Sequence, residues 1–204
     1  MRIGVFGGSF DPPHLGHLSL AASCQEQADL DQVWFVPAAQ QPFKPRGPEA
    51  TDAHRLAMLE RACADQTAFK VCDIEIGRGG VSYTVNTLQT VRCDWPQASL
   101  FFLMGADSLS DLPRWHRPIE ICQLAIPLVV RRAGSDQAGF DILRDLVSSE
   151  RMAEILQSQV DMPIMPISSS EIREKIPADG EWQQLVPLAV AEYIQQHGLY
   201  GCHH

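Results

Sequence analysis

The sequence predicts an α/β fold in which helices cover both faces of a doubly wound, parallel sheet. Two observations lead to this prediction. Short apolar runs rich in Val, Ile and Phe alternate with longer amphipathic stretches, which is the pattern of βαβ units. The 204 residues are 45% hydrophobic and 20% charged, and no linker or internal repeat divides them, so we expect one Rossmann-like domain over residues 1–204.

The predicted elements follow one another along the chain. Apolar runs predict strands near residues 3–6, 33–36, 69–74, 100–104, 124–130 and 162–166. The amphipathic stretches between them predict helices near residues 16–27, 53–64, 85–93, 142–157, 169–176 and 185–197. Four prolines and one glycine between Pro37 and Pro48 predict a stiff, non-helical loop.

The overall composition narrows the class of protein. A formal net charge of −9 argues against a broad nucleic-acid-binding surface, which needs clustered Lys and Arg. The sequence has no long apolar run and no secretory leader, so we expect a cytoplasmic protein without a membrane partner. Six cysteines without a C-x-x-C pair indicate free thiols. The sequence leaves open whether identical chains form a homo-oligomer.

The first motif lies between the first predicted strand and helix, where residues 7–17 read GGSFDPPHLGH. In α/β sheets this connection is a usual ligand site. Gly7 and Gly8 let backbone N–H groups approach a phosphate, and Gly16 leaves room for a nucleotide. His14 and His17, three residues apart, would share a helical face and donate hydrogen bonds to phosphate oxygens. The ordered string predicts a phosphate-binding cradle.

A zinc site is a weaker interpretation of the histidine pair, and two common glycine-rich nucleotide-binding motifs are further alternatives. The zinc site is disfavoured because no third Cys, His or carboxylate ligand follows the histidine pair in a recognisable pattern. No G-x-x-x-x-G-K-[ST] string occurs, and the glycines at 77, 79 and 80 do not form G-x-G-x-x-G because Ser82 stands at the last position. The P-loop and the dinucleotide-binding fingerprint are therefore both absent.

The second motif, ISSSEIR at residues 167–173, follows the last predicted strand. Ser168 and Glu171 have the spacing of a capping box, which explains these two residues without any ligand. Arg173 is more informative, because a cation in the first turns of a helix opposes the macrodipole unless an anion binds there. Ser169 lies four residues before Arg173 and can share that anion. We therefore expect a triphosphate contact.

The two motifs together resemble those of the nucleotidyltransferase superfamily with GG[ST]FDPxHxGH and ISS[ST]xIR signatures. Among these, the chain is most similar to the bacterial nicotinate mononucleotide adenylyltransferases, from residue 1 to about residue 201. Further matches are SYT at 82–84, GADSL at 105–109 with Trp115, VRR at 130–132 and YIQQHGLY at 193–200. One departure is Pro42-Phe43-Lys44, where the family often has Pro-His-Lys.

The resemblance implies an enzyme that transfers AMP from ATP, bound as its Mg²⁺ complex, to nicotinate mononucleotide. The implied catalytic residues are His14, His17 and Arg173. The implied ATP and phosphate ligands are Gly7, Gly8, Ser9, Phe10, Gly16, Lys44, Gly105, Asp107, Ser168 and Ser169. The implied acceptor ligands are Ser82, Tyr83, Thr84, Trp115 and Arg131. No protein-bound metal is implied.

Several alternatives remain at this point. The acceptor could be nicotinamide mononucleotide, phosphopantetheine or another phosphate. A nucleotide-binding regulatory module without turnover and an NAD-dependent oxidoreductase are alternatives of other classes, and the second lacks the glycine fingerprint. At single positions, Trp115 could be a partly buried core residue and Lys44 a solvated loop lysine.

Overall fold

The computed structural model describes residues 1–43, 47–132, 139–163, 165–178 and 180–202. The strands are β1 (Arg2–Gly8), β2 (Gln32–Pro37), β3 (Phe69–Val71), β4 (Ser99–Gly105), β5 (Ile126–Arg132) and β6 (Val160–Met162). The α-helices are α1 (Leu15–Gln27), α2 (Asp52–Cys63), α3 (Ile74–Arg78), α4 (Thr84–Asp94), α5 (Ala106–Asp111), α6 (Pro118–Leu124), α7 (Ser149–Gln157), α8 (Ser169–Lys175) and α9 (Leu188–Gln196). Short 3₁₀ turns are η1 (Leu112–Arg114), η2 (Phe140–Leu143), η3 (Gln183–Leu185) and η4 (Leu199–Gly201).

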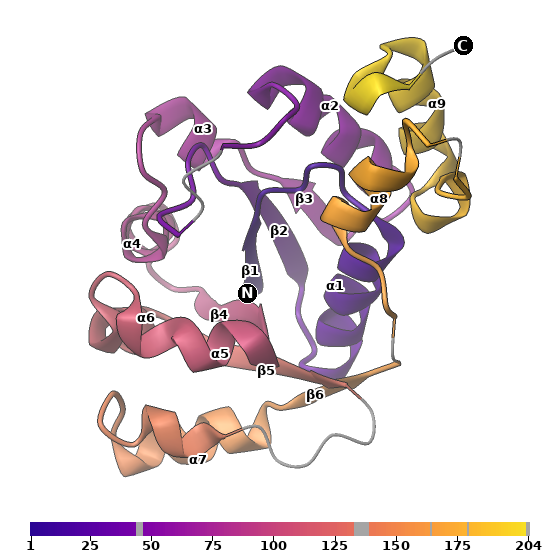
Figure 1. Ribbon diagram of the computed structural model, residues 1–204. Coiled ribbons are helices and arrows are strands. Elements are labelled where there is room, and N and C mark those ends of the chain that lie inside the picture. The colour runs from indigo at the N-terminus through magenta and orange to yellow at the C-terminus, as the bar shows by residue number, and fades with distance from the viewer. Residues whose placement is uncertain (44–46, 133–138, 164, 179, 203–204) are drawn as a thin grey trace.

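The six strands form one parallel sheet in the order β3-β2-β1-β4-β5-β6 (Figure 1). The chain moves outward in one direction from β1 to β3, returns to the centre, and moves outward in the other direction from β4 to β6. The order therefore reverses between β1 and β4. In doubly wound sheets, ligands bind at the carboxyl ends of the strands at this reversal point, and the predicted fold class is confirmed.

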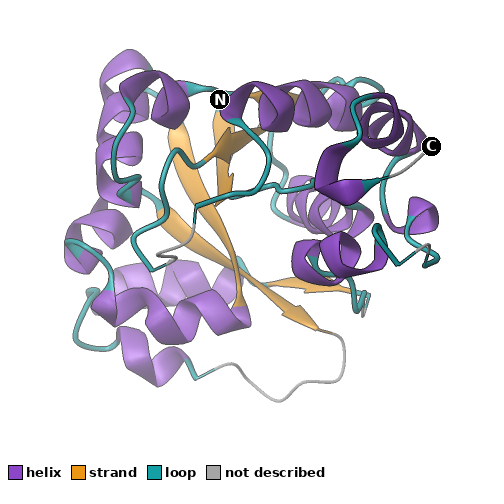
Figure 2. Ribbon diagram, turned by 45° about the horizontal axis from the view of Figure 1, so that its top comes forward, coloured by secondary structure: helices purple, strands orange, loops and turns teal. Residues whose placement is uncertain are grey.

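Helices cover both faces of the sheet (Figure 2), and an apolar layer lies on each face. Strand β4 contributes to both layers. Its side chains alternate, because successive residues of a strand point to opposite faces. Leu100 and Phe102 pack in the layer with α4, α6 and α7, whereas Phe101 and Leu103 pack in the layer with α1 and α2. Burial on both faces explains why the strand sequences are continuously apolar rather than alternating.

A third apolar cluster attaches the C-terminal helices to α2. It contains Met58 of α2, Ile172 of α8, and Trp182 and Ile194 further along the chain, all at most 2% exposed. Figure 1 shows α8 and α9 beside α2, at the same end of the sheet as the turn after β1. The C-terminal part of the chain is thereby brought next to the first motif.

Several predicted boundaries were wrong for identifiable reasons. The expected strand at 162–166 lies at Val160–Met162, because Pro163 cannot donate a ladder hydrogen bond. The helix expected from 142 starts at Ser149, where Ser148 Oγ accepts the backbone N–H of Arg151 as an N-cap. The helix expected from 185 starts after Pro187, which restricts the preceding residue to an extended backbone.

Other differences concern short segments. The strand expected at 69–74 stops at Val71, and Ile74 begins α3 instead. The strand expected from 124 starts at Ile126, because Leu124 ends α6. The sequence did not predict α3, α5 or α6. These helices have five to seven residues, too few to display an amphipathic period. Within the described ranges, no helix has the length and apolarity needed to cross a membrane.

Candidate active site

Buried contacts fix the shape of the turn after β1. Phe10 has a left-handed backbone with φ of 48°, and the peptide bond between Asp11 and Pro12 is cis. Asp11 is only 3% exposed. Its carboxylate accepts the backbone N–H of Glu49 at 2.7 Å and that of Ala50 at 3.1 Å. Asp11 therefore binds the turn to the end of the Pro-rich loop.

The glycines of the first motif have different surroundings. A Cβ atom on Gly8 would lie 3.0 Å from Cζ of Phe10, and one on Gly16 would lie 3.0 Å from Nδ1 of His14. These two glycines thus make room for rings of the same motif, a role that the sequence did not predict. A Cβ on Gly7 would meet no described atom within 4 Å, so only Gly7 simply leaves its backbone open.

The two histidines of the motif stack on each other, with ring centroids 3.6 Å apart and planes at 25°. They do not share a helical face as expected, because His14 is the extended N-cap residue of α1 and only His17 lies in the helix. The backbone N–H of His14 donates to Nδ1 of His17 at 3.2 Å. Because Nδ1 of His17 accepts this bond, its neutral ring carries the proton on Nε2, which is then a donor.

His14 is neutral at physiological pH. The residue is 6% exposed, and this burial lowers the pKa of its imidazole from 6.5 to about 4. Its Nδ1 atom is buried and has no hydrogen-bond partner among the described residues. His14 therefore contributes a neutral ring to the site, without a charge of its own.

The second motif forms α8 and contacts the first motif directly. Arg173 donates from Nη1 to the carbonyl of Asp11 at 2.8 Å and from Nε to Oε1 of Glu49 at 2.7 Å. Ser169 donates from Oγ to the carbonyl of Pro12 at 2.9 Å. Two segments separated by more than 150 residues in sequence are thereby joined at one point.

Two details of the second motif were predicted wrongly. Arg173 lies in the last turn of α8, because the helix has only seven residues, so its charge does not oppose the macrodipole. The capping box is half formed. Ser168 Oγ accepts the backbone N–H of Glu171 at 3.2 Å, but the Glu171 carboxylate pairs with Lys175 at 2.8 Å.

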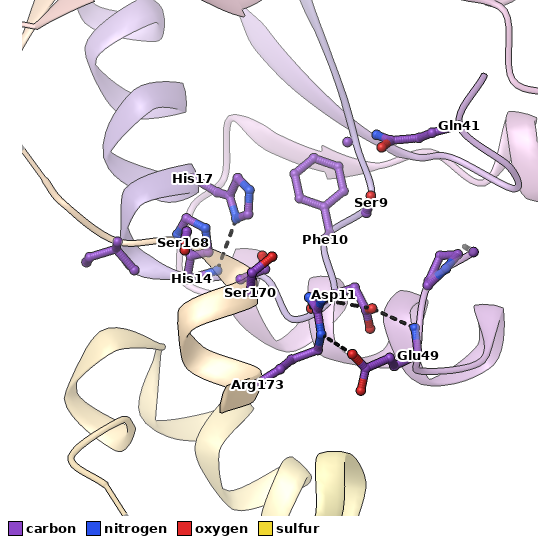
Figure 3. Close-up of a pocket in the computed structure, with 15 residues that line it drawn as sticks. Ser9, Phe10, Asp11, His14, His17, Gln41, Glu49, Ser168, Ser170 and Arg173 are labelled. Carbon is purple, nitrogen blue, oxygen red and sulfur yellow. Dashed lines mark hydrogen bonds and ion pairs between the residues drawn. The ribbon is translucent and has the colours of Figure 1, made fainter. Parts of the chain in front are cut away.

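Both motifs line one cavity of about 630 Å³, which we call the histidine pocket (Figure 3). In Figure 3 the rings of His14 and His17 lie on one side of it, and Arg173 and Glu49 lie on another. Its lining residues are Gly8, Ser9, Phe10, Asp11, His14, His17, Gln41, Gly47, Pro48, Glu49, Ile167, Ser168, Ser169, Ser170 and Arg173. The structure therefore brings the three predicted catalytic residues together with half of the predicted ATP and phosphate ligands.

A second cavity of about 300 Å³, the aromatic pocket, contains Ser82, Tyr83, Thr84 and Trp115. Tyr83 packs on His116 with ring centroids 4.5 Å apart, and Trp115 meets Phe102 edge-on at 5.6 Å. Trp115 is thus both packed against the core and available to the cavity. Ser82 Oγ accepts the backbone N–H of Ala39 at 2.9 Å and attaches the start of the Pro-rich loop.

A third cavity of about 390 Å³, the side pocket, adjoins the histidine pair. His14, Gly16 and His17 line one part of it, and Gly105 and Ala106 line another. The predicted ligand Asp107 is the second residue of α5 and follows the lining residue Ala106, but its side chain is not among those described.

Residues 5–175 match the family model described as cytidylyltransferase-like. The chain belongs to the cytidylyltransferase-like family. Proteins named "Probable nicotinate-nucleotide adenylyltransferase" are among its relatives. One from Salinibacter ruber is 40% identical over 200 residues, with 98% of each chain covered. One from Thermomicrobium roseum is 41% identical over 199 residues, covering 98% of this chain and 91% of the relative.

Solved structures agree with the fold of this cytidylyltransferase-like chain. The Plasmodium falciparum nicotinic acid mononucleotide adenylyltransferase complexed with NaAD has a TM-score of 0.74 at 17% identity, covering 99% of this chain and 98% of that one. The same enzyme complexed with APC has a TM-score of 0.73. At this identity the likeness supports the fold alone. The relatives and the family match confirm the predicted resemblance.

One predicted ligand is not brought to these pockets, and a second cannot be placed because it falls outside the described residues. Arg131 of the cytidylyltransferase-like chain is not among the residues that line the aromatic pocket. Its guanidinium pairs instead with the Asp161 carboxylate across β5 and β6, at 2.9 Å and 3.2 Å. Lys44 lies outside the described residues.

Sequence reasoning also missed several residues of the site. Glu49 pairs with Arg173, and nothing in the Pro-rich loop marks it. Glu75 lines the aromatic pocket, but its segment directly follows an apolar run that predicts a strand. Tyr200 donates from its hydroxyl to Oδ1 of Asp11 at 2.8 Å. The YIQQHGLY match at residues 193–200 indicates only that Tyr200 belongs to the family pattern, not where its hydroxyl lies.

The pockets do not contain an evident metal centre. Over the part of the chain that the structure describes, no three His, Cys, Asp or Glu side chains are grouped to hold a metal ion. The two carboxylates of the histidine pocket are already engaged, Asp11 by backbone N–H groups and Glu49 by Arg173.

Proposed function

We propose that this nucleotidyltransferase transfers the adenylyl group of ATP to nicotinate mononucleotide and releases pyrophosphate, forming nicotinate adenine dinucleotide. The names of the relatives at about 40% identity over nearly the full chain support this activity. One observation in the structure carries the proposal. The histidine pocket and the aromatic pocket adjoin at the reversal point of the sheet, and Gly8 and Gln41 line both.

The histidine pocket suits the triphosphate. His17 offers an Nε2 donor, Arg173 offers a guanidinium, and the backbone of the first motif surrounds the same space. Such donors stabilise the negative charge that develops on the phosphoryl oxygens during transfer. The adenosine part of ATP would occupy the side pocket, beside Gly16 and Gly105. When ATP binds, a phosphate oxygen replaces the Glu49 carboxylate as the partner of Arg173.

The aromatic pocket suits the acceptor. Trp115 and Tyr83 present flat faces or edges to a pyridine ring. The Thr84 hydroxyl and nearby backbone N–H groups can donate to a ring carboxylate, which favours the acid over the amide. We therefore propose nicotinate mononucleotide rather than nicotinamide mononucleotide as the preferred acceptor.

Direct in-line attack accounts for the reaction. The acceptor's 5′-phosphate has a second pKa near 6, as phosphate monoesters do, so at pH 7 it is mostly dianionic and needs no general base. Its oxygen attacks the α-phosphorus of ATP, and pyrophosphate leaves on the opposite side. The protein contributes position and charge neutralisation. We infer that Mg²⁺ enters with the triphosphate as part of the substrate.

The cellular setting is part of the proposal. All six cysteines are free thiols, as in proteins of a reducing compartment. We therefore place the reaction in the cytoplasm.

The decisive experiment measures pyrophosphate release with ATP and Mg²⁺ in the presence of three acceptors tested in parallel. Nicotinate mononucleotide should give the highest kcat/KM, ahead of nicotinamide mononucleotide, and phosphopantetheine should give no turnover. Turnover with phosphopantetheine alone would contradict the assignment of the aromatic pocket. Binding of ATP without pyrophosphate release in the presence of any of the three acceptors would contradict the proposed enzymatic activity.

A further inference from the structure

A buried carboxylate lines the aromatic pocket, and the chemistry proposed above does not use it. Glu75 of α3 is 5% exposed and lines the cavity together with Thr84 and Trp115. Thr87 of α4 donates from Oγ1 to Oε1 of Glu75 at 2.5 Å. This bond joins α3 to α4, the helix that begins at Thr84, so it holds the carboxylate close to the segment proposed to bind the acceptor.

No described cation is in direct contact with the Glu75 carboxylate, although the Arg78 guanidinium lies one hydroxyl away. Among the ion pairs formed by described residues, none includes Glu75. Arg78, one turn further along α3, directs Nη2 to the Thr87 hydroxyl at 3.4 Å. The other carboxylate that lines the pocket, Asp111, is paired with Arg114 at 3.5 Å. A buried carboxylate whose countercharge is not in direct contact is incompletely stabilised, so a cationic ligand is favoured here.

The walls of the pocket favour a cation for a second reason. Tyr83, Phe102, Trp115 and His116 all line it. The negative faces of aromatic rings attract cations, and the attraction is larger in a site that excludes water. A delocalised, flat cation satisfies both the rings and the carboxylate.

We propose that Glu75 is a specificity-determining residue that recognises the positive charge of a pyridinium ring in the acceptor. This inference rests on the proposed function, in which the acceptor is a pyridine mononucleotide. In such a molecule the ring nitrogen is bonded to the ribose, so its positive charge is fixed at every pH. The ring carboxylate is bound elsewhere in the pocket, by Thr84 and backbone N–H groups. The pocket thus selects a zwitterionic ring.

The test compares two acceptors that differ in ring charge. Nicotinate mononucleotide has the cationic ring, and its 1,4-dihydro form has a neutral ring with the same carboxylate, ribose and phosphate. Wild-type enzyme should prefer the cationic form. Glu75→Gln keeps the oxygen that accepts from Thr87 and removes the charge. It should lower kcat/KM for the cationic acceptor about tenfold, through KM, and change kcat/KM for the neutral acceptor less than about twofold.

Two control variants separate charge from packing. Thr87→Val removes the hydroxyl from the same hydrogen bond without changing any charge, so the cationic acceptor should still be preferred, whereas any loss from altered packing should appear with both acceptors. Glu120→Gln removes a carboxylate from α6 that accepts from Gln89 of α4 at 2.5 Å and pairs with Arg117. Glu120 is not among the residues lining the aromatic pocket, and its variant should change neither acceptor.

The possible results are distinct. Equal losses with both acceptors in Glu75→Gln would show that Glu75 only supports the pocket, and would overturn the inference. If that variant does not fold, the wild-type comparison decides, because equal kcat/KM for the two ring forms would also overturn it. Wild-type turnover with a non-pyridine acceptor alone would instead refute the proposed function, and this inference with it. Unchanged KM for ATP in Glu75→Gln supports a role confined to the acceptor.

Discussion

His17 is the residue whose geometry predicts the largest effect on turnover. Its Nδ1 accepts the backbone N–H of His14, which orients the ring and leaves Nε2 as the donor toward a phosphate oxygen. We expect His17→Ala to lower kcat about 100-fold with the fold intact, because one oriented donor to the transition state is lost. Steady-state kinetics and circular dichroism check this. Near-normal turnover in a folded variant would remove His17 from the mechanism.

A matched control is available for this substitution. His54 of α2 also forms a hydrogen bond through Nδ1, to the Tyr193 hydroxyl at 2.9 Å, but it is not among the residues lining the three pockets. His54→Ala should leave kcat unchanged. A loss equal to that of His17→Ala would mean that removing any packed imidazole disturbs the enzyme.

His14 should make stability depend on pH. Its pKa is lowered to about 4 in the folded chain from 6.5, so between these values the unfolded chain binds a proton that the folded chain does not. The free energy of unfolding therefore falls as the pH falls through this range, by about 2 kcal/mol at pH 5. His14→Asn keeps an N-cap side chain without this titration.

Denaturant unfolding of both proteins at about pH 7.5 and about pH 5 measures this contribution. Other groups titrate in both, so the difference between the two losses isolates His14. The wild-type protein should lose about 2 kcal/mol more than His14→Asn. Equal losses would show that the imidazole is hydrated in the folded chain.

At the scale of elements, the C-terminal 3₁₀ turn supports the ATP site from a distance. Tyr200 has φ of 59°, a left-handed backbone that costs a non-glycine residue about 1 kcal/mol or more, and its hydroxyl reaches Asp11. Burial and the neighbouring Asp11 carboxylate raise the pKa of Tyr200, so the phenol stays protonated and remains a donor. Asp11 in turn holds the backbone beside Glu49 and offers its carbonyl to Arg173.

Tyr200→Phe should therefore raise KM for ATP by about fivefold to tenfold, because a hydrogen bond to a carboxylate is lost. KM for the acceptor should not change. Tyr193→Phe is the control, since it removes a hydroxyl that bonds His54 from the same apolar cluster without touching Asp11. If both variants lower thermal stability but neither changes KM for ATP, Tyr200 is only a packing residue.

The same elements show what a sequence can predict. The parallel sheet and the two motifs were predictable, because the four central strands are apolar on both faces and each motif is contiguous. The histidine pocket was predictable because the two contiguous motifs supply most of its lining. The positions of Glu75 and Glu49 in the site were not predictable, because tertiary packing brings them there and no local sequence pattern marks them. Arg131 was misplaced because its neighbour Asp161 on β6 is thirty residues away in sequence.

At the scale of the whole molecule, the reversal of strand order decides where the substrates meet. The turn after β1 faces the histidine pocket, while residues from α3, α4, β4 and α5 line the aromatic pocket. The two cavities share Gly8, the last residue of β1. The attacking phosphate and the α-phosphorus of ATP must approach each other there. A side chain at Gly8 would press on the Phe10 ring beside this junction.

We therefore expect Gly8→Ala to lower kcat more than tenfold with smaller changes in either KM, because a displacement of about 1 Å between reacting atoms costs up to about 100-fold. The new Cβ would also lie 3.0 Å from the Phe10 ring, which must shift. Gly77→Ala is the matched control: its Cβ meets no described atom within 4 Å, and Gly77 is not a lining residue of either pocket. Steady-state kinetics with both substrates varied would distinguish the two variants. A change confined to KM for one substrate in Gly8→Ala would place the meeting point of the substrates elsewhere along the sheet edge.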